Sequence, residues 1–361
     1  MRNSIKIVIA FYLVIYSGIS YAQNTENYKE QDLNFISNGN KISGKLIIPL
    51  KEPVQKLPMV VFVHGSGPED YSSSDNYSFL FEKFTEIGFA CYSWDRPGVG
   101  NSEGKWYEKS VKERAQEVID AVKMLKTIAL IDSTRVGFWG ISQAGWVIPE
   151  VAGIVAPAFV ISVSSPATTA VEQELYRVET SMRTNGFSRK DIKKAISYTK
   201  AVNTIVDTDQ PYVEFANLQK KIKDQKWVGN VITGDETVYR YLSIVFKDDE
   251  PPAFKNLNCP VLAIWGKNDL VVPSKKSARI FENKMKAIGN QNFSIKIVAD
   301  ADHTMTFNVT GKSSATRERR EQYKHNPKEI FAPGYVSLMT DWLTELNFEN
   351  KSKKENKRNF N

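Results

Sequence analysis

The chain of 361 residues is poor in the side chains that bind metals or form disulfides. It contains two cysteines, Cys91 and Cys259, and three histidines, with no Cys-x-x-Cys pair and no cluster of His and Cys. Protein metal sites need several such ligands at short spacings. The sequence therefore predicts neither a metal site nor a bound cofactor.

Long apolar runs are also scarce, and the one that stands out covers residues 7–19. Arg2 and Lys6 precede or begin this run, and the small residues of SYAQ (20–23) follow it, which is typical of a secretory signal peptide cleaved after Ala22. The run is shorter than the roughly 20 residues of a membrane span, so a retained anchor is the weaker alternative. We predict a signal peptide over 1–22 and an exported, periplasmic or secreted, mature protein with no stable membrane span.

The net charge of +7 is concentrated at the two ends of the chain. Two positive charges fall in the expected signal peptide, and the tail 349–361 carries five basic and two acidic residues. The tail lacks interleaved aromatic residues, so it is typical of a solvated, disordered end rather than of a nucleic-acid-binding arm. We expect a small molecule or a short peptide as the ligand and no nucleic-acid partner, and the sequence leaves the oligomeric state open.

Between these ends, residues 23–348 alternate strand-like and helix-like segments, which predicts an α/β fold with a mostly parallel central sheet and helices on both faces. Residues from about 167 to 256 show only helical patterns and are too many for a loop, so we expect a helical cap inserted over one end of the sheet. Two strands are expected within 30–49, and the further strands at 58–65, 89–95, 135–140, 158–166, 259–266 and 293–300. Helices are expected at 78–88, 110–128 and 334–346.

A serine follows one of these strands at a sharp expected turn. The segment VGFWGISQAGWVIP (136–149) passes from strand to helix at Ser142, with the small residues Gly140 and Ala144 two positions away on either side. Such a turn lifts the serine hydroxyl above the sheet, as a nucleophile elbow requires. The simpler alternative is a serine that caps the helix.

Two further strands end in residues that complete this chemistry. Asp269 lies in the loop after 259–266, and His303 follows 293–300. Ligands bind at the carboxyl ends of parallel strands, and the order Ser, Asp, His is that of a nucleophile with its orienting acid and base. We therefore predict a triad of Ser142, His303 and Asp269, although Asp269 could be only a turn residue. His325 is the competing base, but it lies in a charge-dense segment typical of the surface.

The segment VHGSGP (63–68) ends another strand with a glycine-flanked bend. Such a bend lets backbone N–H groups face a developing negative charge, so we expect an oxyanion hole formed by the backbone N–H groups of Ser66 and Gln143. His64 is expected to support the bend.

Five segments together resemble the α/β-hydrolase superfamily, and more narrowly its bacterial capped esterases and serine aminopeptidase-like hydrolases. They are HGSGP (64–68), WDRPGVGNSEG (94–104), GISQAG (140–145), WGKNDLVVP (265–273) and ADHTM (301–305), and the resemblance spans about residues 30–347. Ala144 departs from the glycine usual in the family. The resemblance implies that the second segment shapes a loop beside the site, through Asp95, Arg96, Gly98, Gly100 and Ser102.

The resemblance also implies a strand order that separates the two cysteines. Cys91 and Cys259 would lie about four strand positions apart, near 19 Å at roughly 4.8 Å a position. That distance is well beyond the roughly 7 Å limit between the Cα atoms of a disulfide. We predict two free, buried thiols.

Three functions remain open. Aromatic residues in the insertion could line an apolar pocket for a carboxylic ester, or could simply form the core of the cap: Tyr198, Tyr212, Phe215, Trp227, Tyr239, Tyr241 and Phe246. An aminopeptidase would need an acid such as Glu172 or Glu174 to hold the substrate ammonium group. A non-catalytic binding protein that keeps the fold is the third possibility. The triad favours a serine hydrolase, with ester cleavage preferred.

Overall fold

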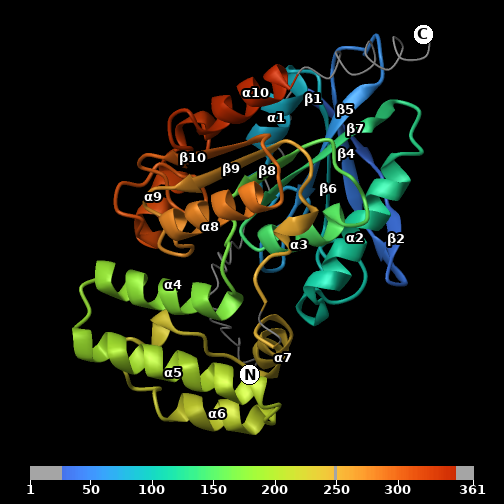
Figure 1. Cartoon of the computed structure of the whole chain (residues 1–361). Coiled ribbons are helices and arrows are strands. Elements are labelled where there is room, and N and C mark those ends of the chain that lie inside the picture. Colours follow the sequence, from blue (N-terminus) through green and yellow to red (C-terminus); the bar gives the residue numbers. More distant parts are fainter. Residues whose placement is uncertain (1–26, 248–249, 347–361) are drawn as a thin grey trace.

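The computed structural model describes residues 27–247 and 250–346, so the expected signal peptide and the tail 349–361 lie outside the described residues. An eight-stranded sheet forms the centre of the molecule (Figure 1). From one edge to the other its strands are β1 (Tyr28–Asp32), β4 (Gly44–Pro49), β6 (Ala90–Trp94), β5 (Leu57–Val63), β7 (Ile131–Ile141), β8 (Val160–Val163), β9 (Val261–Gly266) and β10 (Phe293–Val298).

The sheet is mostly parallel, as predicted. Strand β4 pairs antiparallel with β1 and with β6, and every pair from β6 to β10 is parallel. Strand β5 is buried at every position, and its side chains alternate between two apolar cores: Met59 and Val61 face one core, and Val60 and Phe62 face the other. This two-sided burial explains why β5 is a nearly continuous apolar run in the sequence.

Helices cover both faces of the sheet. Helices α1 (Ser78–Glu86) and α10 (Tyr335–Glu345) pack on one face, and α2 (Val111–Leu125), α3 (Ala144–Ala152) and α8 (Ser274–Ala287) pack on the other. Helix α9 (Ser313–Gln322) follows the last strand. The segment 30–49 differs from the two expected strands: it holds β4, the end of β1, and the separate hairpin of β2 (Phe35–Ser37) and β3 (Asn40–Ile42) around Asn38 and Gly39.

Four helices lie between β8 and β9 in the chain: α4 (Ala170–Thr184), α5 (Arg189–Asp207), α6 (Tyr212–Lys220) and α7 (Glu236–Val245). Figure 1 shows α4, α5 and α6 as a separate layer at one end of the sheet. The seven aromatic residues of the insertion named above all belong to one apolar cluster between these helices. They therefore form the core of the insertion.

The two cysteines are free and buried, as predicted. Cys91 lies in β6 and Cys259 just before β9, and these two strands are four positions apart in the sheet.

Within residues 27–247 and 250–346, no helix is both long enough and apolar enough to cross a membrane.

Candidate active site

Ser142 lies at the junction of β7 and α3 in a strained backbone conformation, with a positive φ of 55°. A non-glycine residue takes this conformation at a cost, and such residues concentrate at functional sites. The neighbours must be small: a Cβ atom on Gly140 would lie 2.7 Å from the Cβ of Ala144 and 2.5 Å from Ile148. The methyl group of Ala144 therefore fits against the end of β7 only because residue 140 has no side chain. The helix-capping alternative is wrong, because the N-cap of α3 is Gln143.

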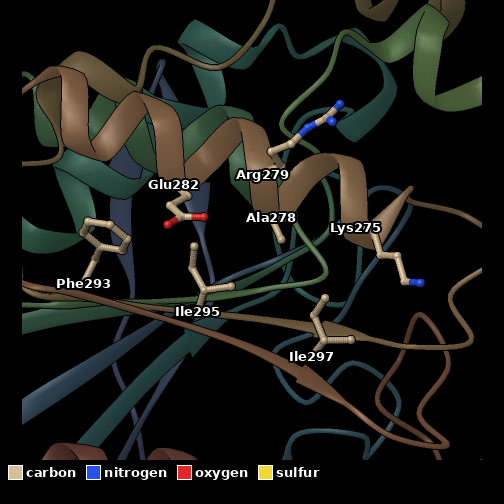
Figure 2. Close-up of a pocket in the computed structure, with 7 residues that line it drawn as sticks. All are labelled: Lys275, Ala278, Arg279, Glu282, Phe293, Ile295 and Ile297. Atoms are coloured by element: carbon tan, nitrogen blue, oxygen red, sulfur yellow. The ribbon is translucent and has the colours of Figure 1, made fainter.

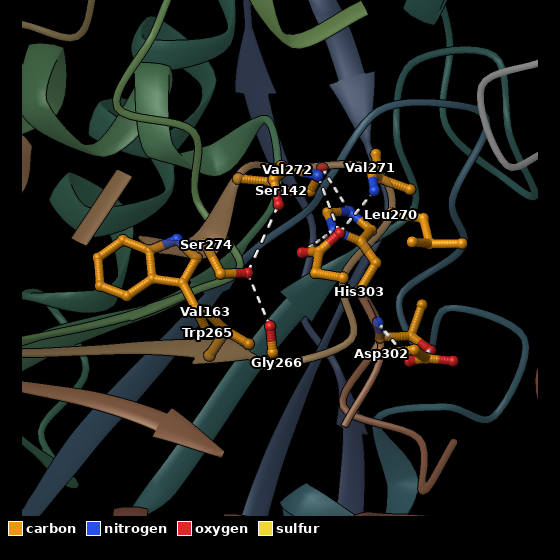
Figure 3. Close-up of polar contacts among 12 residues, drawn as sticks. Ser142, Val163, Trp265, Gly266, Leu270, Val271, Val272, Ser274, Asp302 and His303 are labelled. Carbon is orange, nitrogen blue, oxygen red and sulfur yellow. Dashed lines mark hydrogen bonds and ion pairs between the residues drawn. The ribbon is translucent and has the colours of Figure 1, made fainter. Parts of the chain in front are cut away.

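His303 joins Ser142 to Asp269. Its Nε2 lies 3.0 Å from Oγ of Ser142, and its Nδ1 lies 2.8 Å from Oδ2 of Asp269. Figure 3 shows the imidazole beside Ser142, above the carboxyl ends of the strands. His303 and Asp269 are buried, whereas Ser142 is half-buried. The structure thus brings together three residues that are up to 161 positions apart in the sequence.

Asp269 is held in place by its own loop. Its Oδ1 accepts hydrogen bonds from the backbone N–H groups of Val271 at 2.7 Å and Val272 at 2.8 Å, which leaves Oδ2 for the imidazole. Asp269 is therefore a turn residue and the partner of His303 at once. Burial opposes a charge on His303, but the carboxylates of Asp269 and, to a smaller extent, Asp302 together outweigh burial and raise the pKa of the imidazole.

The peptide groups of Ser66 and Gln143 have fixed orientations. The carbonyl of Ser142 accepts a hydrogen bond from the N–H of Gly145 at 2.9 Å, inside the first turn that leads into α3. The carbonyl of Gly65 accepts one from the guanidinium of Arg114 at 3.0 Å. In a planar trans peptide the N–H points away from the carbonyl. The N–H of Gln143 therefore points away from the N–H of Gly145, and the N–H of Ser66 points away from the guanidinium of Arg114.

The other two histidines lie apart from this arrangement. His64 is buried, and its Nε2 donates to the carbonyl of Trp94 at 2.6 Å. Burial lowers the pKa of His64 to about 3, so the imidazole is neutral and supports the bend. His325 is exposed, as predicted.

The loop after β6 surrounds the glycine-flanked bend. Arg96 is buried and donates to the carbonyl of Gly67 at 2.7 Å. Asp95 accepts the backbone N–H groups of Tyr71 and Asn101, and the hydroxyl of Ser102 donates to the Asp95 carbonyl. These contacts hold the loop and involve no atom of Ser142 or His303.

A small cavity of about 30 Å³ opens onto these residues. It is lined by Ser66, Ser142, Gln143, Trp146, Ala170, Gln173, Arg177, Val245, Val271 and His303. A larger hollow of about 440 Å³ lies between α8 and β10, and Figure 2 shows that Lys275, Arg279 and Ile295 are among its lining residues. The larger hollow contains none of the predicted site residues. Among the described residues, no three His, Cys, Asp or Glu side chains are grouped to hold a metal ion.

The two acids considered as ammonium anchors are already engaged. Glu174 is buried, and both of its carboxylate oxygens accept from Arg177, at 2.6 and 2.7 Å. Glu172 pairs with Lys276 at 3.4 Å on the surface.

Sequence reasoning missed Arg114 and Arg177. Arg114 lies on α2 in the same helical stripe as Val111, Ala115 and Val118, and a charged residue within an apolar stripe was the available signal. Arg177 is separated from Ser142 by β8 and the start of the insertion, and no pattern in the sequence places it in the cavity.

The chain is similar to known hydrolases. The model of the alpha/beta hydrolase family matches residues 60–310. The esterase EstD of Thermotoga maritima is 23% identical over 316 residues, which cover 84% of this chain and 66% of that relative. Among solved structures, an esterase of Pyrococcus furiosus is 16% identical at a TM-score of 0.49, with 84% of this chain and 92% of that chain covered. The acylaminoacyl peptidase of Pyrococcus horikoshii is 16% identical at a TM-score of 0.46, and the match covers 86% of this chain and 44% of the peptidase.

The matched span of the family model takes in β7, β9 and β10, the strands that carry Ser142, Asp269 and His303 at their ends. It covers well over half of the chain, and the sheet around it has the parallel order described above. The resemblance predicted from the five sequence segments is confirmed, and the chain belongs to the alpha/beta hydrolase family.

Proposed function

We propose that this alpha/beta hydrolase is a serine esterase that cleaves short-chain carboxylic esters through an acyl-enzyme intermediate. The observation that carries the proposal is the continuous chain of hydrogen-bond contacts from Asp269 through His303 to Ser142, which ends at a cavity lined by Ser142 and His303. Nucleophile, base and orienting acid in contact are the arrangement of serine hydrolases on several unrelated folds.

In the first half of the reaction, Oγ of Ser142 attacks the ester carbonyl while Nε2 of His303 removes its proton. The carboxylate of Asp269 keeps the second proton of the ring on Nδ1 and stabilises the imidazolium that forms. The N–H groups of Ser66 and Gln143 donate to the oxyanion of the tetrahedral intermediate. Collapse of this intermediate breaks the bond to the alcohol oxygen, and His303 gives its proton to the leaving alcohol.

In the second half, His303 removes a proton from water, and the resulting hydroxide oxygen attacks the acyl carbon. The tetrahedral intermediate again places its oxyanion at Ser66 and Gln143. The bond to Oγ of Ser142 then breaks, Ser142 regains the proton from His303, and the carboxylic acid leaves. No cofactor takes part in these steps.

The cavity favours esters over peptides and short acyl chains over long ones. Its volume of about 30 Å³ is far below the roughly 300–1,000 Å³ of a typical ligand pocket, so it accepts an acetyl group more readily than a long acyl chain. An aminopeptidase needs a carboxylate for the substrate ammonium group, but Glu174 already neutralises Arg177 with both oxygens. Peptidase activity is therefore the second candidate and a non-catalytic binding protein the third.

The test compares hydrolysis of p-nitrophenyl acetate and butyrate with that of aminoacyl-p-nitroanilides, using the mature protein and the Ser142→Ala variant. We expect ester turnover that is lost in the variant, and stoichiometric labelling of Ser142 by a fluorophosphonate. Turnover of the anilides alone would support the peptidase. A folded protein that neither turns over esters nor reacts with the fluorophosphonate would support the binding protein.

We also propose that residues 1–22 direct export of the protein, and that 23–348 form the hydrolase domain with its cap at about 167–256. Export would be tested by fractionating the native host and determining the N-terminal residue of the exported protein. A first residue at position 23 is expected, and an uncleaved cytoplasmic chain would contradict the proposal.

A further inference from the structure

A buried arginine links the two segments that carry the proposed oxyanion donors. Arg114 on α2 is only 4% exposed. Its Nη2 donates to the carbonyls of His64 at 2.6 Å and Gly65 at 3.0 Å, and its Nη1 donates to Oε1 of Gln143. One guanidinium group therefore contacts both the bend after β5 and the residue that follows Ser142.

The contact with Gly65 determines where the N–H of Ser66 points. The Gly65 carbonyl and the Ser66 N–H belong to the same peptide group, and they point in opposite directions. When Arg114 holds the carbonyl on the α2 side, the N–H must face the other side, and Ser66 lines the cavity next to Ser142. A cation on the carbonyl also polarises the peptide, which strengthens the N–H as a donor.

Gln143 is held at both ends of its side chain. Arg114 binds Oε1, and Nε2 donates to the hydroxyl of Tyr241 on α7 at 3.3 Å. The side chain of Ser66 also hydrogen-bonds to Tyr241. These contacts hold the side chain of Gln143 between α2 and the helical insertion, and so restrain the backbone to which it is attached.

A second buried arginine, Arg96, also binds the bend. Arg96 is 1% exposed and donates to the carbonyl of Gly67, and the nearby Glu117 carboxylate favours the charged form of both arginines. Burial and Arg96 lower the pKa of Arg114 to about 9, so Arg114 remains charged at neutral pH. Glu69 also lies near Arg96, so two carboxylates match the two guanidinium groups in number, and the arginines act on the bend through their hydrogen bonds to its carbonyls.

We propose that Arg114 is the positioning residue of the oxyanion hole, orienting the Ser66 peptide directly and the Gln143 peptide through its side chain. The inference rests on the proposed serine-esterase mechanism. Because Arg114 does not line the cavity, its loss acts through the two peptides and not through contact with the substrate. Correct orientation matters most when negative charge develops on the carbonyl oxygen, so the transition state is affected more than substrate binding.

The experiment measures kcat and KM for p-nitrophenyl acetate in Arg114→Met and Arg114→Lys, together with inhibition by an aryl trifluoromethyl ketone and by its methyl ketone counterpart. The trifluoromethyl ketone adds to the serine and forms an oxyanion, whereas the methyl ketone reports on ground-state binding. Arg135→Met is the matched control, because Arg135 also donates to a backbone carbonyl, that of Lys56, at the opposite end of the sheet. Circular dichroism and thermal unfolding establish that each variant is folded.

For Arg114→Met we expect kcat to fall about 10- to 100-fold, below the 10²- to 10³-fold typical of losing one donor outright, with KM changed less than about threefold. Affinity for the trifluoromethyl ketone should fall by the same factor as kcat/KM, and affinity for the methyl ketone should stay constant. Arg114→Lys keeps a charge but lacks the planar fork that reaches both segments, so it should be intermediate. Arg135→Met should behave as the wild type.

Wild-type kcat and inhibitor affinity in a folded Arg114→Met would overturn the inference, as would a loss of kcat without a parallel loss of trifluoromethyl ketone affinity. If Arg114→Met does not fold, Arg114→Lys decides: parallel losses of about fivefold or more support the inference, and wild-type values refute it. Turnover that survives in Ser142→Ala would refute the serine-esterase mechanism itself. An inactive Ser142→Ala with unaffected Arg114 variants would refute only the role of Arg114.

Discussion

Replacing Asp269 by asparagine tests how the site controls the imidazole of His303. The two backbone N–H groups of Val271 and Val272 require an acceptor, so the amide oxygen of the new side chain would take the place of Oδ1. The amide NH₂ would then face Nδ1 of His303, which lies 2.8 Å from the carboxylate in the wild type. A donor at that position favours the tautomer with its proton on Nε2, where it faces Ser142 and cannot accept the serine proton.

The expected loss of kcat is large, because the variant favours the wrong tautomer of His303 and lacks the negative charge of the Asp269 carboxylate. Loss of tautomer control in a serine triad lowers kcat by about 10⁴-fold, equivalent to about 5.5 kcal/mol of transition-state stabilisation. The pH profile should also move. The neutral imidazole is the base, so kcat/KM in the wild type rises with pH through a pKa above 6.5. Without the Asp269 carboxylate, the midpoint of this rise should shift to lower pH.

The assay is hydrolysis of p-nitrophenyl acetate from pH 5 to 10, with Asp302→Asn as the matched control. Asp302 is a buried acid next to His303 in the chain, but it binds Thr304, Thr306 and Thr316 instead of the imidazole. Its replacement should leave kcat within about tenfold of the wild type and shift the pH profile to lower pH by less than Asp269→Asn does, because Asp302 contributes less to the raised pKa of His303. A folded Asp269→Asn with kcat within tenfold of the wild type, or with an unshifted profile, would refute the reasoning.

Three further predictions concern the packing and the cavity. Gly140→Ala should lower the free energy of unfolding by about 1–3 kcal/mol in urea titrations, because its Cβ would lie 2.5 Å from Ile148; an unchanged value would contradict the elbow packing. Glu174→Gln should cost about 3–5 kcal/mol by removing the charge of the buried carboxylate that binds Arg177 through both oxygens, whereas Glu179→Gln, in an exposed pair on the same helix, should cost less than about 1 kcal/mol. Across p-nitrophenyl acetate, butyrate and hexanoate, kcat/KM should fall as the chain lengthens; a rise would contradict the small cavity.

The sequence was sufficient to predict the sheet and the three residues that meet at its edge. Buried parallel strands are continuous apolar runs, and the residues directly after them must lie at one edge of the sheet. Ser142, Asp269 and His303 each follow such a run, so the sequence pattern alone predicts that they lie together, and their hydrogen bonds agree with this prediction. The position of a residue just after a strand is informative because all parallel strands of a sheet end on the same side.

Other contacts depend on packing that no local pattern encodes. Arg114 precedes Gln143 by 29 residues and follows Gly65 by 49, and its role depends on how α2 packs against the ends of β5 and β7. Helix α8 was not predicted, since its lysine-rich sequence has a low mean hydropathy and only a narrow buried stripe. The hairpin of β2 and β3 was merged with its neighbours because each strand has only three residues.

The two buried arginines are difficult to explain by stability. Removing an ion from water costs several kcal/mol even after the protein relaxes, and apolar side chains of similar volume often stabilise a fold as well or better. Arg96 and Arg114 nevertheless donate to the carbonyls of His64, Gly65 and Gly67, three residues of one short bend. Because the Gly65 carbonyl is held by a cation, the N–H of Ser66 is already oriented before a substrate arrives, so it needs no reorganisation as the oxyanion forms. The cost of burying the charges is therefore most simply understood as the cost of preorganising the site.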